Sequence, residues 1–118
     1  MTIRPLFAAL AVTALAGCAA DPAPNEQMRL TGQALEQATA VGATVEDVPE
    51  LKLAEGKYSQ AKADMADQSF KDARVQAEQA ELDARLAEAK VLTLKSQEQL
   101  NVLNTRIARL RKQLGDAQ

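Results

Sequence analysis

Apolar residues recur at intervals of three and four through most of the chain, which is the spacing of one face of an α-helix. This spacing predicts three helices, at about 26–40 (or as far as Thr44), 49–66 and 70–114. No Gly or Pro interrupts the third segment, so it should form a rod of about 65–70 Å, at about 1.5 Å per residue. The chain is therefore expected to be all-α.

Local signals mark the ends of these helices. Asn25 can cap the first helix, which Gly32 is expected to weaken. Pro49 suits the first turn of the second helix, because its missing N–H costs nothing there. The break after the second helix contains no Gly or Pro, and Ser69 with Asp72 is expected to form a capping pair for the third helix.

The third segment carries two apolar stripes, of which the first consists mainly of Ala. Its members are Ala73, Ala77, Ala80, Ala84, Ala87, Val91 and Leu94. Small residues let helix axes approach closely, so the second segment is expected to fold back against this stripe as a hairpin. The matching stripe of the second segment is Leu51, Ala54, Tyr58, Ala61 and Met65. Tyr58 and Phe70, the aromatic residues of this region, are expected to fill its core.

The second stripe predicts a surface for a partner. It contains Leu82, Leu86 and Ala89, is interrupted at Thr93 and Ser96, and continues as Leu100, Leu103, Ile107, Leu110 and Leu114. The second helix can cover the third only to about Glu88, which leaves an overhang of roughly 35–40 Å. The seam from Leu100 to Leu114 should then be bare, and a coiled coil with a second copy or with another protein is the expected use. A solvated tail, or cover by the first helix, are the alternatives.

Composition excludes several kinds of chemistry. The 118 residues are 47% hydrophobic and 3% aromatic, and much of the apolar content is Ala. The chain therefore has few large side chains with which to fill a globular core. The chain has no His and one Cys, which excludes zinc and haem sites built on these residues, Ser-His and Cys-His catalysis and internal disulfides. A thin hairpin offers no pocket to shift the pKa values of paired carboxylates. We therefore expect no enzyme, cofactor, metal site or small-molecule substrate.

The first 17 residues have the features of a signal peptide: a positive start at Arg4 and a short apolar run. The run ends in Leu15-Ala16-Gly17-Cys18, which resembles the bacterial lipobox at all four positions. The resemblance implies that a peptidase recognises Leu15, Ala16 and Gly17 and cuts before Cys18. It also implies that Cys18 carries a diacylglycerol and an N-linked acyl chain such as palmitate, which together anchor firmly. A plain secretory signal or a membrane helix with a chance Cys is the alternative.

Cleavage there would divide the chain into a signal peptide (1–17), a lipidated, Pro-containing tether (18–25) and a helical domain (26–118). The net charge is −2, and removing Arg4 makes it −3, so nothing electrostatic favours nucleic acid. In the lipoproteins that this chain resembles, Ala rather than Asp after the Cys favours export. Ala19 therefore predicts attachment to the periplasmic face of the outer membrane.

A family resemblance lies in the hairpin region. Its residues are Val48-Pro49-Glu50-Leu51, Ala54, Ala61, Phe70-Lys71-Asp72-Ala73 and the run from Ala77 to Ala87 that includes Ala77-Glu78-Gln79-Ala80. From about Thr39 to Lys90 this pattern resembles the bacterial lipoprotein family called domain of unknown function 4398. The resemblance implies a helical hairpin, distantly like one tetratricopeptide unit, in an envelope lipoprotein. It implies no activity.

A basic cluster ends the third helix: Arg106, Arg109, Arg111 and Lys112. Positive charge near a helix C-terminus is favourable in itself, because the carbonyl dipoles point there. The functional interpretation of the basic cluster is contact with an anionic partner such as the cell wall. The sequence therefore predicts a non-enzymatic, lipid-anchored scaffold, with non-covalent peptidoglycan binding through the basic cluster as the alternative.

Overall fold

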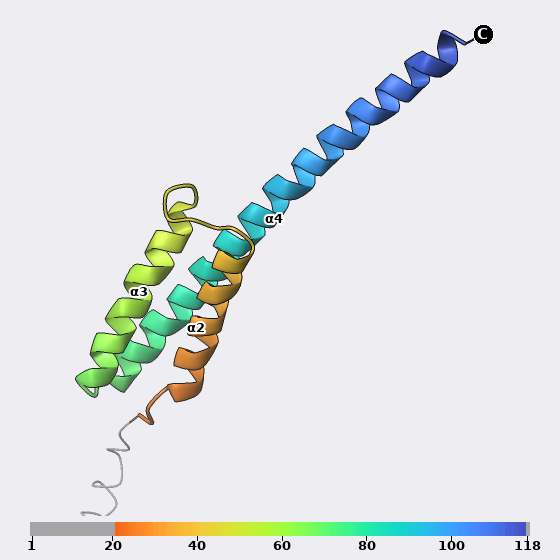
Figure 1. Ribbon diagram of the computed structural model, residues 1–118. Coiled ribbons are helices and arrows are strands. Elements are labelled where there is room, and N and C mark those ends of the chain that lie inside the picture. Colours follow the sequence, from red (N-terminus) through yellow and green to blue (C-terminus); the bar gives the residue numbers. More distant parts are fainter. Residues whose placement is uncertain (1–20, 118) are drawn as a thin grey trace, which may run out of the picture.

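The computed structural model describes residues 21–117, and these residues form three helices with no strand among them (Figure 1). The helices are α2 (Asn25–Ala40), α3 (Pro49–Ala66) and α4 (Phe70–Gly115). The predicted all-α class and the three segments are confirmed. None of the described helices is long and apolar enough to cross a membrane. Residues 1–20, which include the signal peptide and lipobox predictions, lie outside the described part.

Two predicted helix caps are wrong. α2 already begins at Asn25, because the Pro24 carbonyl accepts the first helical hydrogen bond, from the Met28 N–H at 3.0 Å. Ser69 does hold the N-cap position of α4, but its side chain makes no capping bond and no pair with Asp72 forms. The Ser69 carbonyl instead accepts the Ala73 N–H at 2.9 Å, so backbone geometry alone starts the helix.

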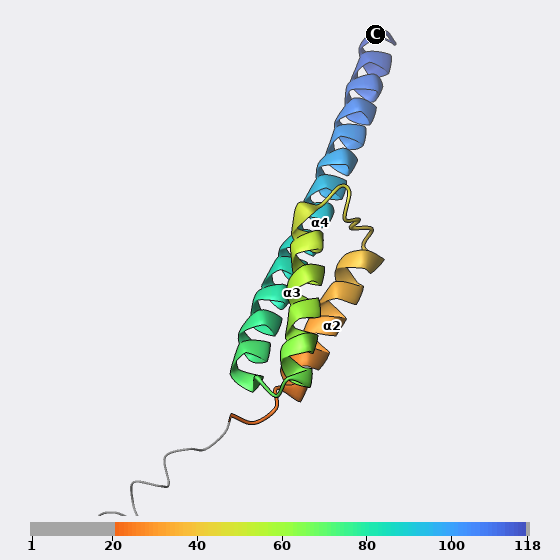
Figure 2. The ribbon, with the colours of Figure 1, turned by 90° about the vertical axis from the view of Figure 1, so that its left-hand side faces the viewer.

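α3 and α4 lie side by side as a hairpin (Figure 2), and the core between them consists of small residues. Every Ala of the first α4 stripe is fully buried, and Val91 is buried at its end. α3 contributes Leu51, Ala54 and Ala61 to the same interface. Leu94, the last residue of the stripe, is exposed, because α3 begins at Pro49 and does not extend to it; this agrees with the predicted limit of cover near Glu88. Tyr58 and Phe70 are only half-buried, so the core is filled by close approach of the helices rather than by aromatic bulk.

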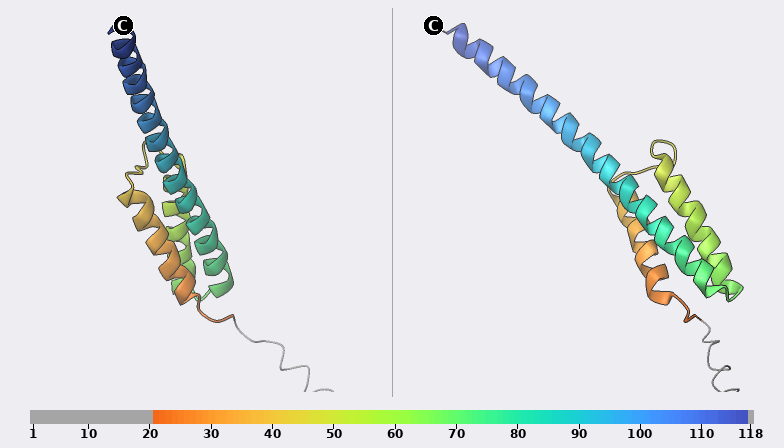
Figure 3. Two further views of the ribbon diagram at one scale, coloured as in Figure 1. Left: turned by 90° about the vertical axis from the view of Figure 1, so that its right-hand side faces the viewer. Right: turned by 180° about the vertical axis from the view of Figure 1, so that it is seen from behind.

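α2 packs chiefly against α4, which completes a three-helix body at the N-terminal end of the rod (Figure 3). Thr31 is fully buried there, and its hydroxyl lies 2.9 Å from the Ala77 carbonyl of α4 and 2.9 Å from the Gln27 carbonyl of its own helix. Gly32 leaves room for the Tyr58 hydroxyl, since an added Cβ would lie 3.1 Å from that oxygen. The residue expected to weaken α2 thus allows it to approach α3.

The turns that follow α2 and α3 have the same hydrogen-bonding pattern. After α2 the Ala43 N–H bonds to the Ala38 carbonyl, and after α3 the Ser69 N–H bonds to the Asp64 carbonyl. This motif requires a left-handed residue just past the helix end. Gly42 takes that position after α2 with φ 95°, and Gln68 takes it after α3 with φ 59°.

The Gln68→Gly variant is therefore expected to be more stable than the parent chain by about 0.5–1 kcal/mol, because Gly adopts the left-handed region without the steric penalty of a Cβ. Gly42→Ala should be less stable than the parent by about 1 kcal/mol, because it adds a Cβ to a residue in the left-handed region. Urea unfolding followed by circular dichroism measures both changes. Equal shifts of the two variants in one direction would contradict this explanation.

Candidate interaction surface on α4

The second apolar stripe of α4 is bare along its whole length. The five predicted contact residues, Leu100, Leu103, Ile107, Leu110 and Leu114, are 45–69% exposed. Leu82 and Leu86 lie on the same stripe and are 67% and 47% exposed. We call the ten positions of alternating four- and three-residue spacing the α4 seam: Leu82, Leu86, Ala89, Thr93, Ser96, Leu100, Leu103, Ile107, Leu110 and Leu114.

The seam is bare beside the body because α2 and α3 both occupy the opposite face of α4. Leu82 is two residues from the buried Ala80 and from the buried Ala84, which places it about 200° around the helix from each. The sequence indicated Leu82 and Leu86, but the predicted contact surface started only at Leu100. The alternative that α2 covers the seam is wrong, because α2 packs on the Ala face.

Beyond the body, α4 projects alone (Figure 1). Every residue from 92 to 117 is exposed, and the last hydrogen bond to another part of the described chain runs from the Lys95 ammonium to the Val41 carbonyl, at 2.7 Å. We call residues 92–115 the projecting segment; its 24 residues span about 36 Å. This agrees with the overhang predicted from the sequence. The hollow that Glu98, Val102, Leu103 and Arg106 line is open to solvent and belongs to one helix, so it is no enclosed pocket.

Polar contacts fix the body on both sides of the seam. On the α3 side, Lys57 pairs with Asp83 at 2.7 Å, and Lys90 pairs with Glu50. On the α2 side, Gln27 donates to Glu81 at 2.7 Å, and Arg85 pairs with the same carboxylate at 2.6 Å. The seam is thus presented on a face whose flanking charges are already held in place.

The Arg85 and Gln27 hydrogen bonds hold the pKa of Glu81 below its ordinary value, and the Lys90 hydrogen bond does the same for Glu50. A lowered pKa in the folded state stabilises the protein above the ordinary Glu pKa of about 4.3, and this contribution is lost as pH falls through the folded value.

Acidification from pH 7 to about pH 3 is therefore expected to lower the urea midpoint less in Glu81→Gln than in the parent chain. Glu55→Gln, at an exposed position of α3, is the matched control and should follow the parent. An identical acid response of all three proteins would show that the Glu81 contacts add no stability.

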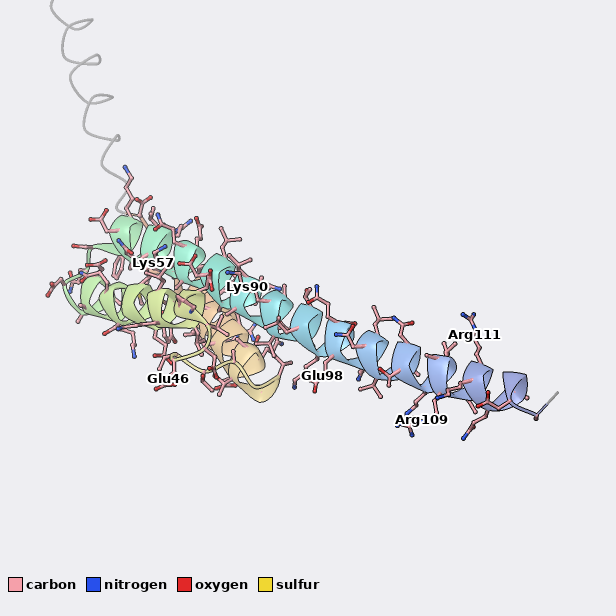
Figure 4. The ribbon with its side chains drawn as sticks, turned by 90° about the horizontal axis from the view of Figure 1, so that it is seen from above. Glu46, Lys57, Lys90, Glu98, Arg109 and Arg111 are labelled. Carbon is pink, nitrogen blue, oxygen red and sulfur yellow. The ribbon has the colours of Figure 1, made fainter. Side chains whose placement is uncertain are left out.

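The basic cluster does not form one patch. Figure 4 shows Arg109 and Arg111 on opposite sides of α4, as their separation of about 200° requires. All four residues of the cluster are exposed, and none is in an ion pair within residues 21–117. Arg106 and Arg111 flank the two edges of the seam, so the cluster surrounds the tip of the helix.

The other predicted sites cannot be placed. Leu15, Ala16, Gly17 and Cys18 lie outside the described residues. Within residues 21–117 no group of three or more acidic, Cys or His side chains is arranged to hold a metal ion.

Comparison with known families shows to which family this chain belongs. The family model described as domain of unknown function DUF4398 matches residues 26–103. The chain belongs to the DUF4398 family. The match is wider than the predicted 39–90 and includes α2, while Ile107, Leu110, Leu114 and the basic cluster lie beyond it.

A solved structure supports both family and fold. The chain is similar to a DUF4398 family protein from Pseudomonas aeruginosa PAO1, whose crystal structure was determined at 2.47 Å resolution. The two are 65% identical with a TM-score of 0.79, and the match covers 82% of this chain and all of the other. No curated protein matches this DUF4398 chain.

Proposed function

We propose that this DUF4398 protein is a non-enzymatic envelope lipoprotein that acts as a structural or protein-interaction scaffold in the periplasm. Cys18, with its diacylglycerol and N-acyl chain, anchors it to the outer membrane, and the α4 seam binds another α-helix. The observation that carries the proposal is the bare seam, which exposes seven large apolar side chains in one line. Exposed apolar surface of this extent on a soluble helix is typical of an interaction site.

The isolation of the projecting segment supports the proposal. The 24 exposed residues of this segment lack the packing from which helices in proteins draw most of their stability. A partner helix along the seam would supply that packing. The heptad spacing of the seam is the spacing that a coiled coil requires.

The binding role can be tested in cells by placing the photo-crosslinking residue benzoylphenylalanine at Leu103. Illumination should give a protein adduct, identified by mass spectrometry as a second copy or an envelope protein. Thr105 is the matched control position, because it is exposed on the same segment but lies off the seam. Adducts of equal yield at both positions, or none at Leu103, would contradict a scaffold that acts through the seam.

The anchor is tested separately by metabolic labelling with an alkyne fatty acid. The parent chain should take up the label and sediment with outer membranes, whereas Cys18→Ser should lose the label and the membrane association. Labelling that persists in Cys18→Ser would show that Cys18 is not the lipid attachment site.

Non-covalent binding to peptidoglycan is the second candidate function, and the basic cluster supports it. Four exposed cations without ion-pair partners in residues 21–117 lie at the end of the rod farthest from the N-terminal tether. If they contact the anionic cell wall, changing all four to Gln should abolish co-sedimentation with isolated peptidoglycan, and added salt should weaken it in the parent. Unchanged co-sedimentation of the variant would exclude this role for the cluster.

A further inference from the structure

We infer that the α4 seam binds the α4 seam of a second copy of the chain, in an antiparallel coiled coil whose two-fold axis lies level with Glu98. This inference rests on the proposed scaffold function and names the partner. The order of large and small residues along the seam, the charges beside it and the length of the projecting segment each support it.

The order of side chains favours the antiparallel arrangement. With the axis at Glu98, Leu100, Leu103 and Ile107 of one copy face the three small or polar positions of the other, which are Ser96, Thr93 and Ala89 respectively. At the ends, Leu110 faces Leu86, and Leu114 faces Leu82. All ten seam positions are then paired, and each small residue meets a large one. In a parallel coil each position meets its own copy, which would leave three consecutive layers of small or polar residues.

The positions of the basic residues also favour the antiparallel arrangement. In a parallel coil Arg106 of one copy would flank Arg111 of the other, and the two basic clusters would lie side by side. In the antiparallel register Arg111 lies across from Asp83 of the second copy, the carboxylate that pairs with Lys57 of α3 at 2.7 Å. Residues 106–112 then lie along residues 84–90 of the second copy, whose charged side chains are Arg85, Glu88 and Lys90. The antiparallel arrangement therefore separates the two basic clusters, which a parallel coil would bring together.

The dimensions also fit. The projecting segment of one copy starts where the body of that copy ends, at residue 92. In the proposed register its tip at Leu114 reaches Leu82 of the other copy, which is the first large apolar residue of the bare seam. α2 and α3 lie on the opposite face of α4 and leave this path free. Each body therefore receives the projecting segment of the other copy, and no large seam residue stays uncovered.

Disulfide trapping can test the register. The fragment 21–118 has no Cys, since Cys18 is the only one in the chain. The crystallised relative, matched over its whole length by 82% of this chain, supports independent folding of the helical part. Arg85→Cys and Gln113→Cys, one of them carrying an affinity tag, should form a mixed disulfide under mild oxidation, because these flanking positions meet in the antiparallel register. Neither variant should form a disulfide dimer alone.

A second variant tests the opposite arrangement. Leu114→Cys should form a disulfide with its own copy in a parallel coil, where equivalent positions meet, but not in the antiparallel one. A strong Leu114→Cys homodimer, or no mixed disulfide between Arg85→Cys and Gln113→Cys, would overturn the inference.

Sedimentation equilibrium then tests association without any added Cys. The parent fragment should dimerise, and Leu103→Lys with Ile107→Lys should weaken the dimer by about 100-fold or more, because four Lys side chains would be buried in the seam in place of large apolar ones. Asn101→Lys with Thr105→Lys adds the same charge off the seam and should dimerise nearly as well. The changed residues are exposed, so the body should fold in both variants, which circular dichroism can verify. A monomeric parent fragment at all concentrations would overturn the inference.

The two proposals can fail separately. A monomeric fragment together with a Leu103 photo-adduct to a different envelope protein would overturn self-association and leave the scaffold function standing. A monomer without any Leu103 adduct would overturn both.

Discussion

Replacing Leu51 by Ala is expected to lower the free energy of unfolding by about 3 kcal/mol. Leu51 is 2% exposed and is the largest buried apolar side chain of the body, among Ala38, Val48, Ala87 and Val91. Its neighbours are small and are held by helix backbones, so they cannot collapse into the space that the change would leave. A small domain has only about 5–10 kcal/mol in total, and this loss should be plain in urea unfolding.

Leu53→Ala is the matched control, because Leu53 lies on the same helix and is 56% exposed. It should change stability by less than about 0.5 kcal/mol. The comparison is best made in the Leu103→Lys, Ile107→Lys background, so that association does not add to stability. If both Ala variants lost the same amount, Leu51 would not be a core residue in solution.

A larger side chain at the centre of the body should lower the free energy of unfolding at least as much as Leu51→Ala does. Ala84 is fully buried, and it lies against Ala34 of α2 and Ala54 of α3. A Leu at this position would force all three helices apart, at a cost of about 3 kcal/mol or more. We expect Ala84→Leu to lose the cooperative unfolding transition or to shift it to much lower urea concentration.

Ala108→Leu is the control for this second prediction, since Ala108 is exposed on the projecting segment of the same helix. Leu and Ala differ little in helix propensity, so that variant should unfold like the parent. A cooperative transition of parental midpoint in Ala84→Leu would show that the three helices are not closely packed around this position.

The helices were predictable because their signals are local and repeated. The three-and-four spacing and Pro49 are sufficient to give the bounds of α3, and the unbroken pattern from Phe70 gives α4. The Ala stripe also predicted the buried face of α4 correctly, up to Val91. The break before α4 has no Gly or Pro, since Gln68 adopts the left-handed conformation that Gly usually supplies.

The packing of α2 could not be predicted, because its signals depend on another helix. Thr31 and Gly32 appear unfavourable within α2 alone, and their use becomes clear only where Ala77 and Tyr58 lie against them. For the same reason the predicted contact surface was too short. Leu82 and Leu86 share the stripe of Leu100, but only the position of α2 and α3 shows that they stay exposed.

The start of α2 and the turn between α3 and α4 lie at the same end of the rod, with the C-terminus at the other (Figure 1). In the antiparallel pair, the Phe70 residues of the two copies would then be separated by twice the 28 helical residues between Phe70 and Glu98, or roughly 84 Å. If both tethers end in one lipid leaflet, the long axis of the pair must lie parallel to the membrane, with an attachment at each end. A single chain can stand upright and carry its basic tip about 70 Å from its base. Association would thus change how far the protein reaches away from the lipid surface, without any change in its fold.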